Sequence, residues 1–309
     1  MLIKAVTRRK AMVVAAMAGL IAALVPAAST AREVTHAMGV TEVPDNPARV
    51  VVLTNEGTEA LLSMGVIPVG AATSFGGDPW YPHIAEQMDG VEPLGTESAI
   101  NLELLTALEP DLILGTKMRH EEIYPQLSAI APTILSERLR GDWKVNQRLY
   151  AQALGTDDKA EEVIAAYDAK VADLRERLGD KTAEEVSIIR FLAAQIRIYQ
   201  LDTFSGVILK DLGFHRPENQ NVEEFAIRTG KESIPDMDGD RIFYFTFDQG
   251  NGEANAAEAE ALADPLWQSL SAVKAGRVHK VDDGIWNTSG GALAANLMLD
   301  DIARIYGVE

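Results

Sequence analysis

The chain has 309 residues, 47% of them hydrophobic and 24% charged, so it can bury either one large core or two smaller ones. Its formal net charge is −18 at pH 7, and so acidic a molecule repels nucleic acid and anionic membranes. We therefore exclude nucleic acid as a partner. The chain contains no cysteine, which excludes disulfides and a lipid-modified cysteine at a cleavage site.

Residues 1–31 have the pattern of a signal peptide. Four basic side chains lie between Lys4 and Lys10, and an uncharged apolar run follows at residues 11–25. That run is short for a membrane span, and small residues then lead to Ala31. We expect export to the periplasm with cleavage near Ala31, by either the Sec or the twin-arginine route.

The first half of the mature chain alternates short apolar runs with amphipathic stretches, which is typical of a mostly parallel α/β sheet. Asn55 is a candidate helix cap and Gly65 a candidate helix stop. The predicted strands are 50–53, 66–71, 111–114 and 133–135, and the predicted helices are 55–64 and 123–130.

Residues 156–178 carry apolar side chains three and four positions apart, which predicts one amphipathic helix about 35 Å long. A second α/β set follows, with strands at 186–192, 196–199, 241–247 and 278–281 and a last helix at 292–305. We predict two lobes joined by one long backbone helix. The boundaries are 1–31 for the signal peptide, 32–155 for the N-terminal lobe, 156–179 for the interlobe helix and 180–309 for the C-terminal lobe.

The two halves share an acidic pattern at the start of a short helix. Glu103 precedes Asp111 by eight residues, and Glu232 precedes Asp240 by the same spacing. Each Asp opens an apolar strand, and each Glu falls in the first helical turn, where the helix dipole favours a carboxylate. Ordinary charges at helix starts would give the same pattern. The residues alone therefore do not decide between a repeat shared by the two halves and a coincidence.

Catalytic motifs are missing from the sequence. We find no nucleophile elbow, no phosphate-binding loop and no dinucleotide-binding glycine motif. The histidines show no metal-binding spacing, although residues far apart in sequence could still converge in space. We expect no enzymatic activity, no metal site and no resident cofactor. His120 is the histidine of most interest because it neighbours Arg119.

Arginines occupy strand ends, where open α/β sheets bind ligands. Arg190 shares a strand face with apolar neighbours, Arg197 shares one with Tyr199, and Arg119 follows the strand that ends at Leu114. Any one of them could form a structural salt bridge. Three at comparable positions favour an anionic ligand, because the guanidinium group suits carboxylates.

Two tryptophans lie in glycine-bearing loops. Trp286 lies in residues 283–291 and Trp80 in residues 77–82. A loop tryptophan either fills the core or lines a pocket. The loop position favours a pocket for Trp286, and for Trp80 the two alternatives are equal.

The sequence resembles the iron–siderophore substrate-binding proteins of bacterial ABC importers over nearly the whole mature chain. The segments that carry the resemblance are 49–53, 59–66, 101–114, 119–124, 130–133, 190–191, 205–206, 211–214 and 286–291. The resemblance implies a class III periplasmic binding protein fold, a monomer, and a ferric siderophore held between the lobes. Iron would arrive only as part of that ligand.

The resemblance also implies the site residues. The ligand-binding set is Arg119, Arg190, Arg197, Trp286, Tyr199 and Trp80. Glu103 and Glu232 would dock onto the ABC permease, which works with its ATPase in the inner membrane. The arginines favour an anionic complex of the carboxylate or the citrate/hydroxamate type. Haem or a corrinoid on the same fold, a periplasmic hydrolase, and a sensor are the alternatives.

Overall fold

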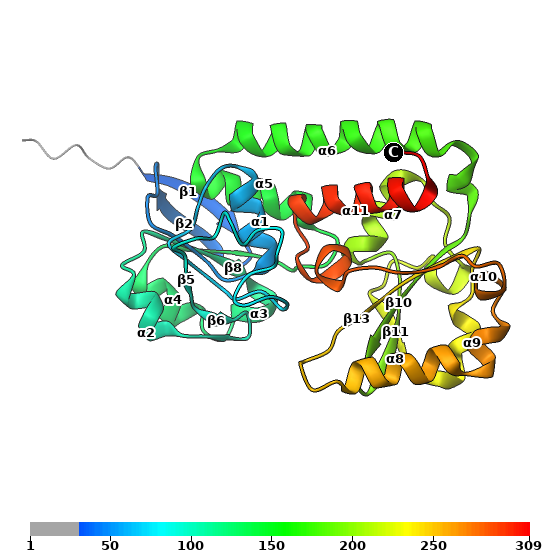
Figure 1. Cartoon of the computed structure of the whole chain (residues 1–309). Coiled ribbons are helices and arrows are strands. Elements are labelled where there is room, and N and C mark those ends of the chain that lie inside the picture. The colour runs from blue at the N-terminus through cyan, green and yellow to red at the C-terminus, as the bar shows by residue number, and fades with distance from the viewer. Residues whose placement is uncertain (1–30) are drawn as a thin grey trace, which may run out of the picture.

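The computed structural model describes residues 31–309 and consists of two α/β lobes bridged by the long helix α6, Asp157–Leu178 (Figure 1). This confirms the predicted fold class. Residues 1–30 of the expected signal peptide lie outside the described residues, and Ala31 is the first residue of strand β1.

The N-terminal lobe contains a five-stranded parallel sheet with the strand order β5-β4-β3-β8-β9. Its strands are β3 (Val50–Val52), β4 (Gly70–Ala71), β5 (Glu92–Pro93), β8 (Leu112–Thr116) and β9 (Thr133–Ser136). The hairpins are β1 (Ala31–His36) with β2 (Gly39–Pro44), and β6 (Gly95–Thr96) with β7 (Ala99–Ile100). The helices are α1 (Asn55–Ser63), α2 (Leu102–Ala107), α3 (Lys117–His120), α4 (Tyr124–Ile130) and α5 (Trp143–Leu154).

Two details of the first lobe differ from the sequence prediction. The N-cap of α1 is Thr54, whose hydroxyl accepts the Gly57 N–H at 3.0 Å, so the assignment of Asn55 as the cap is wrong. The strand predicted at 66–71 is reduced to Gly70–Ala71. The hairpin of β1 and β2 and the helix α5 were not predicted.

The C-terminal lobe contains a mixed sheet with the strand order β12-β11-β10-β13-β14. Its strands are β10 (Val186–Leu192), β11 (Gln195–Tyr199), β12 (Ala226–Thr229), β13 (Arg241–Thr246) and β14 (Val278–Lys280). Its α-helices are α7 (Phe204–Leu212), α8 (Glu253–Ala263), α9 (Pro265–Ser269), α10 (Ser271–Lys274) and α11 (Ala292–Tyr306). Shorter turns are the 3-10 helices η1 (Gly179–Ala183), η2 (Glu218–Gln220) and η3 (Lys231–Met237) and the π-helix η4 (Gly284–Thr288). Strands β10, β13 and β14 are parallel, whereas β11 and β12 run antiparallel to their neighbours.

The helix α6 buries one stripe that serves both lobes. Ala160 belongs to the core of the first lobe, and Tyr167 and Leu174 belong to the core of the second. The last helix, α11, lies along α6 and also packs against α1 of the first lobe (Figure 1). The two lobes are therefore joined along one side by two packed helices.

The acidic pattern that the two halves share corresponds to a hydrogen-bonded connection that is repeated in both lobes. The Asp111 carboxylate accepts the backbone N–H groups of Ala48 and Arg49, just ahead of β3. In the second lobe the Asp240 carboxylate accepts the Glu185 N–H, just ahead of β10. Each aspartate thus ties the start of its own strand to the start of the neighbouring parallel strand.

A buried glutamate of α1 ties the first lobe to α11. The Glu59 side chain is fully buried, and its Oε2 accepts the Ala294 N–H at 2.9 Å. Its Oε1 lies 2.5 Å from His83 Nε2. The residue before α11 is Gly291, where a Cβ atom would come within 2.5 Å of Glu59 Cβ. Glu59 therefore supplies from the other lobe the helix cap that Gly291 cannot provide.

Replacing Glu59 should destabilise the whole molecule. We expect Glu59→Ala to lower the free energy of unfolding by about 3 kcal/mol, because it leaves buried partners without hydrogen bonds. Urea denaturation measures this value. Glu161→Ala, which removes an exposed partner of Arg148, is the control and should leave stability close to wild type. A Glu59 variant as stable as this control would contradict the cross-lobe cap.

Candidate functional site

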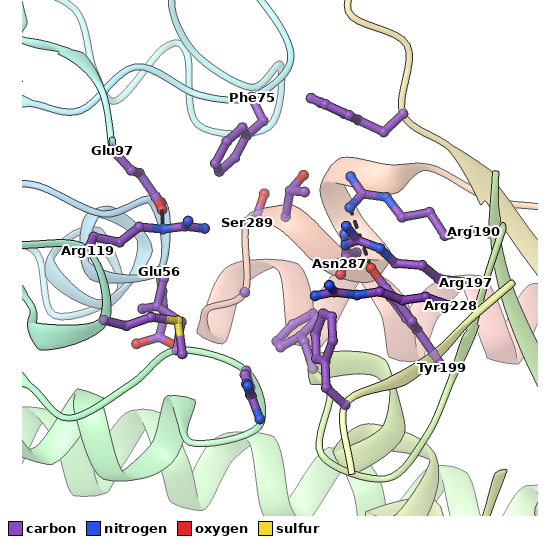
Figure 2. Close-up of a pocket in the computed structure, with 18 residues that line it drawn as sticks. Glu56, Phe75, Glu97, Arg119, Arg190, Arg197, Tyr199, Arg228, Asn287 and Ser289 are labelled. Carbon is purple, nitrogen blue, oxygen red and sulfur yellow. Dashed lines mark hydrogen bonds and ion pairs between the residues drawn. The ribbon is translucent and has the colours of Figure 1, made fainter. Parts of the chain in front are cut away.

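A cavity of about 400 Å³ lies between the lobes and receives side chains from both (Figure 2). Glu97 and Arg119 face it from the first lobe, and Arg190, Arg197 and Arg228 face it from the second. The structure thus brings together three of the predicted arginines. It adds Arg228, which the sequence analysis missed because strand β12 was not predicted. It also adds Arg140, which lies before α5 and is paired with Asp202 at 2.8 Å.

The three arginines of the second lobe form a row across adjacent strands, which we call the arginine ladder. Arg190 of β10 is in register with Arg197 of β11, and Arg197 is in register with Arg228 of β12. Directly opposed residues of antiparallel strands project to the same face, about 5 Å apart. Like charges placed opposite each other destabilise a sheet, so the ladder needs negative charge nearby.

The first arginine of the ladder, Arg190, is already neutralised by the protein. Arg190 is only 6% exposed and forms two contacts with Asp283, from Nε at 2.7 Å and from Nη2 at 2.8 Å. Its guanidinium also lies over the Phe247 ring, 4.8 Å from the centroid. Arg190 is therefore held rigidly, with its charge balanced by Asp283.

The other two arginines of the ladder, Arg197 and Arg228, are not neutralised by the described residues. The Nε of Arg197 is buried and has no hydrogen-bond partner within residues 31–309. The side chain of Arg228 is exposed and forms no ion pair or hydrogen bond in the same part of the chain. The cavity thus offers two guanidinium groups that are free to bind an anion.

Aromatic rings surround the ladder. Tyr199 is fully buried, and its hydroxyl lies 3.5 Å from Nη1 of Arg190. Phe225 lies under the guanidinium of Arg197, 5.9 Å from it. Phe75 and Phe247 meet edge to face across the lobes with their centroids 6.2 Å apart. These rings make the cavity partly apolar, as expected where a large organic ligand is bound.

The wall from the first lobe is different in character. Arg119 is ion-paired with Glu97, with 3.3 Å between Nε and Oε2. Glu97 is 2% exposed, and its Oε1 accepts both the backbone and the side-chain N–H of Asn55. Glu56 also lines this wall and accepts a hydrogen bond from Asn146 at 2.7 Å. Burial raises the pKa of Glu56 well above its usual value.

The two tryptophans of the predicted set do not line this cavity. The pocket position favoured for Trp286 is wrong, and for Trp80 the structure selects the core, one of the two alternatives left open. Trp286 is fully buried, stacks against Phe243 at 4.6 Å and donates its Nε1–H to Asp301 at 3.0 Å. Trp80 is 8% exposed and belongs to the core of the first lobe. A loop tryptophan buries its large apolar surface where it can, and here the core accepts both. The polar residues that follow Trp286, from Asn287 to Gly290, face the cavity instead.

His120 is a structural residue beside the cavity. It is 1% exposed, its Nδ1 accepts the Thr116 N–H at 3.1 Å, and its Nε2 donates to the Glu97 carbonyl at 3.0 Å. Burial lowers the pKa of His120 to about 4. The neutral ring therefore fixes the segment that carries Glu97. Within residues 31–309 no group of three or more His, Cys, Asp or Glu side chains is arranged to hold a metal ion.

Comparison with known proteins gives the family. Residues 50–283 match the family model described as periplasmic binding protein, and the chain belongs to this family. It is 50% identical to the probable siderophore-binding lipoprotein YfiY of Bacillus subtilis, over 90% of this chain and 88% of that protein. It is 32% identical to the achromobactin-binding periplasmic protein of Dickeya dadantii, over 85% and 87% of the two chains.

A solved structure shows the same fold. The crystal structure of Staphylococcus aureus SirA complexed with staphyloferrin B is 34% identical in sequence, with a TM-score of 0.85. The match covers 90% of this chain and 99% of that one. The family comprises substrate-binding proteins, in agreement with the two-lobed architecture and the cavity between the lobes.

The buried His120 should make stability depend on pH. The unfolded chain binds a proton at His120 below about pH 6.5, whereas the folded chain binds one only near pH 4. Its contribution is therefore complete above pH 6.5 and is lost as the pH falls to 4, by about 1.4 kcal/mol per pH unit. We expect the free energy of unfolding of His120→Asn to fall less steeply than that of wild type over this window. Parallel curves would contradict the assignment.

Proposed function

We propose that this protein is the periplasmic substrate-binding component of an ABC importer and that it captures an anionic ferric siderophore of the carboxylate type. The observation that carries the proposal is the arginine ladder, with Arg197 and Arg228 free to pair with ligand carboxylates. A ligand that brings about two negative charges would neutralise both. The guanidinium group matches a carboxylate through paired hydrogen bonds, which adds specificity to charge.

The known relatives support this ligand class. YfiY is named as siderophore-binding, the Dickeya relative as achromobactin-binding, and SirA was crystallised with staphyloferrin B. Haem is disfavoured because His120 uses both ring nitrogens in contacts with the protein, and Tyr199 is engaged with Arg190. The cavity thus offers charge for an anion rather than an axial ligand for a metal.

Iron enters this proposal as part of the cargo. The protein would hold the ferric complex without covalent chemistry, with no resident cofactor and no enzymatic activity. Export to the periplasm is supported by the signal-like residues 1–31 and by relatives named as lipoproteins or periplasmic proteins. Among residues 31–309 no helix combines the length and apolarity that a membrane crossing requires.

Delivery requires a surface that the permease can recognise, and we assign it to Glu103 and Glu232. Both are exposed and lie in the first turn of a short helix, α2 and η3 respectively. The Glu232 carboxylate accepts the Gly230 N–H at 3.1 Å, and backbone hydrogen bonds lower its pKa. Asp111 and Asp240 form equivalent hydrogen bonds to the backbone in the two lobes, which supports equivalent roles for Glu103 and Glu232. We propose that a monomer docks with one carboxylate from each lobe.

Loss of the two unpaired arginines of the ladder, Arg197 and Arg228, should abolish binding of the ferric siderophore. We expect Arg197→Ala combined with Arg228→Ala to weaken binding of ferric citrate-type complexes by at least 100-fold, because each lost charge-assisted pair costs about 1.5–3 kcal/mol. Quenching of tryptophan fluorescence during titration measures the affinity. Lys274→Ala, on the surface of α10, is the control and should leave the affinity unchanged. A double variant that binds as tightly as wild type, or wild type that binds haem or cobalamin instead, would refute the anionic-siderophore proposal.

The docking assignment can be separated from capture. Glu103→Ala combined with Glu232→Ala should retain ligand affinity but abolish uptake of iron-loaded siderophore, because the two contacts with the permease are lost. The measurement is radioactive-iron uptake in cells that depend on this protein. Glu86→Ala with Glu253→Ala removes the same charge from two other exposed sites and should support normal uptake. Normal uptake by the Glu103 and Glu232 variant would remove these residues from the docking surface.

A further inference from the structure

The two lobes also meet at a cluster of four charged side chains beside the cavity. Arg138 and Arg140 come from the first lobe, in the connection between β9 and α5, and Asp202 comes from the second lobe, just before α7. One carboxylate oxygen of Asp202, Oδ2, accepts Arg138 Nη1 at 2.6 Å and Arg140 Nη1 at 2.8 Å. Asp142 balances Arg138 from within the first lobe. Asp202 is therefore the negative charge that the second lobe supplies to Arg140.

The segment that carries the two arginines is held from both lobes. Arg140 has a φ of 88°, which costs free energy for a residue other than glycine and persists only where surrounding contacts hold it. At Gly141 a Cβ atom would come within 2.5 Å of Val207 Cγ2, in α7 of the second lobe. The Arg138 carbonyl accepts the side-chain N–H of Asn146 at 2.8 Å, which fastens the same segment to α5.

A cation of the second lobe lies close to Arg140. The guanidinium of Arg140 is 5.2 Å from the centroid of the Phe225 ring, and the guanidinium of Arg197 is 5.9 Å from the same centroid. Two cations beside one ring repel each other, because water and salt screen them only in part at this spacing. Arg140 and Arg197 belong to different lobes and both line the cavity, so their repulsion acts between the lobes.

We propose that Asp202 is a positioning residue that holds the lobes together by balancing Arg140. Without this carboxylate, the repulsion between Arg140 and Arg197 opens the cavity. Asp202 is not among the described residues that line the cavity, and its side chain is 12% exposed. It therefore acts through Arg140. The proposal goes beyond substrate capture and does not depend on which ligand is bound.

Loss of Asp202 would also remove two hydrogen bonds between the lobes, and the experiment must separate this cause from unbalanced charge. The two causes differ in what reverses them. Repulsion is relieved when one of the two cations is removed, or when salt screens them, since the Debye length falls to about 3 Å at 1 M. Neither change restores a missing hydrogen bond.

The separation of the lobes can be measured without a ligand. The chain contains no cysteine, so nitroxide labels attach only to introduced cysteines, here Gln126→Cys in α4 and Ala256→Cys in α8. Both positions are exposed, and both helices lie on the side of the molecule away from α6 (Figure 1). Pulsed electron paramagnetic resonance then gives the distribution of distances between the two lobes.

We expect Asp202→Asn to lengthen the mean distance between the labels by more than about 2 Å, the scale of a domain rearrangement. Addition of Arg140→Gln should return the distance to that of wild type, because the unbalanced cation is gone. Addition of Arg197→Gln instead should do the same, since it removes the other cation. Raising sodium chloride from about 50 mM to about 1 M should shorten the distance in Asp202→Asn.

Glu223→Gln is the matched control, because Glu223 pairs with Lys210 inside the second lobe, at 2.6 Å. It should leave the distance between the labels unchanged. Urea denaturation shows whether each variant is folded. If Asp202→Asn alone does not fold, the combination with Arg140→Gln should still fold, because it carries no unbalanced cation. Failure of both to fold would overturn the proposal, since the damage would then not depend on charge.

Two other results would also overturn it. One is an Asp202→Asn variant with the same distance distribution as wild type. The other is an opening that persists after removal of either cation and at high salt, which would assign the role of Asp202 to its hydrogen bonds alone. Neither result bears on siderophore capture, which the titration of the Arg197 and Arg228 double variant tests separately.

Discussion

The arrangement of the site depends on the cost of placing three guanidinium groups in one row of a sheet. Opposed like charges destabilise a strand pair, and the protein offsets this cost only in part. Asp283 balances Arg190, and Phe225 and Phe247 lie under the cations. Within residues 31–309 no acidic side chain balances the charge on Arg197 and Arg228. A bound anion would therefore balance the two guanidinium groups that the described residues leave unpaired.

A row of this kind requires the antiparallel part of the second sheet. Strands β11 and β12 add two antiparallel neighbours to the parallel core of β10 and β13, and the register brings one arginine from each strand to the same level. Arg216 supports the same strands from the interior through hydrogen bonds to the carbonyls of Val186 and Tyr199. The helices α6 and α11, with the cap from Glu59, then hold this wall opposite the first lobe.

Much of the fold was predictable because its elements are locally encoded. The β-branched run of β10 and the apolar stripe of α6 predicted their bounds to within a residue. The same alternation placed Arg190 and Arg197 at the cavity. Arg228 was missed because β12 is a short edge strand without a clear apolar pattern. Trp286 was misplaced because periodicity does not tell whether a loop side chain turns toward the core or away from it.

The wall from the first lobe could not be predicted from the sequence, for a different reason. Glu56 and Glu97 read as ordinary surface acids, and only tertiary contacts with Asn146 and Asn55 reveal that they are buried. Their burial changes the role of Arg119, which a sequence pattern presents as a free cation. Because Glu97 already balances Arg119, this pair adds no net charge to the cavity. Among the described residues, the unbalanced positive charge of the cavity therefore lies on Arg197 and Arg228 and not on the wall of the first lobe.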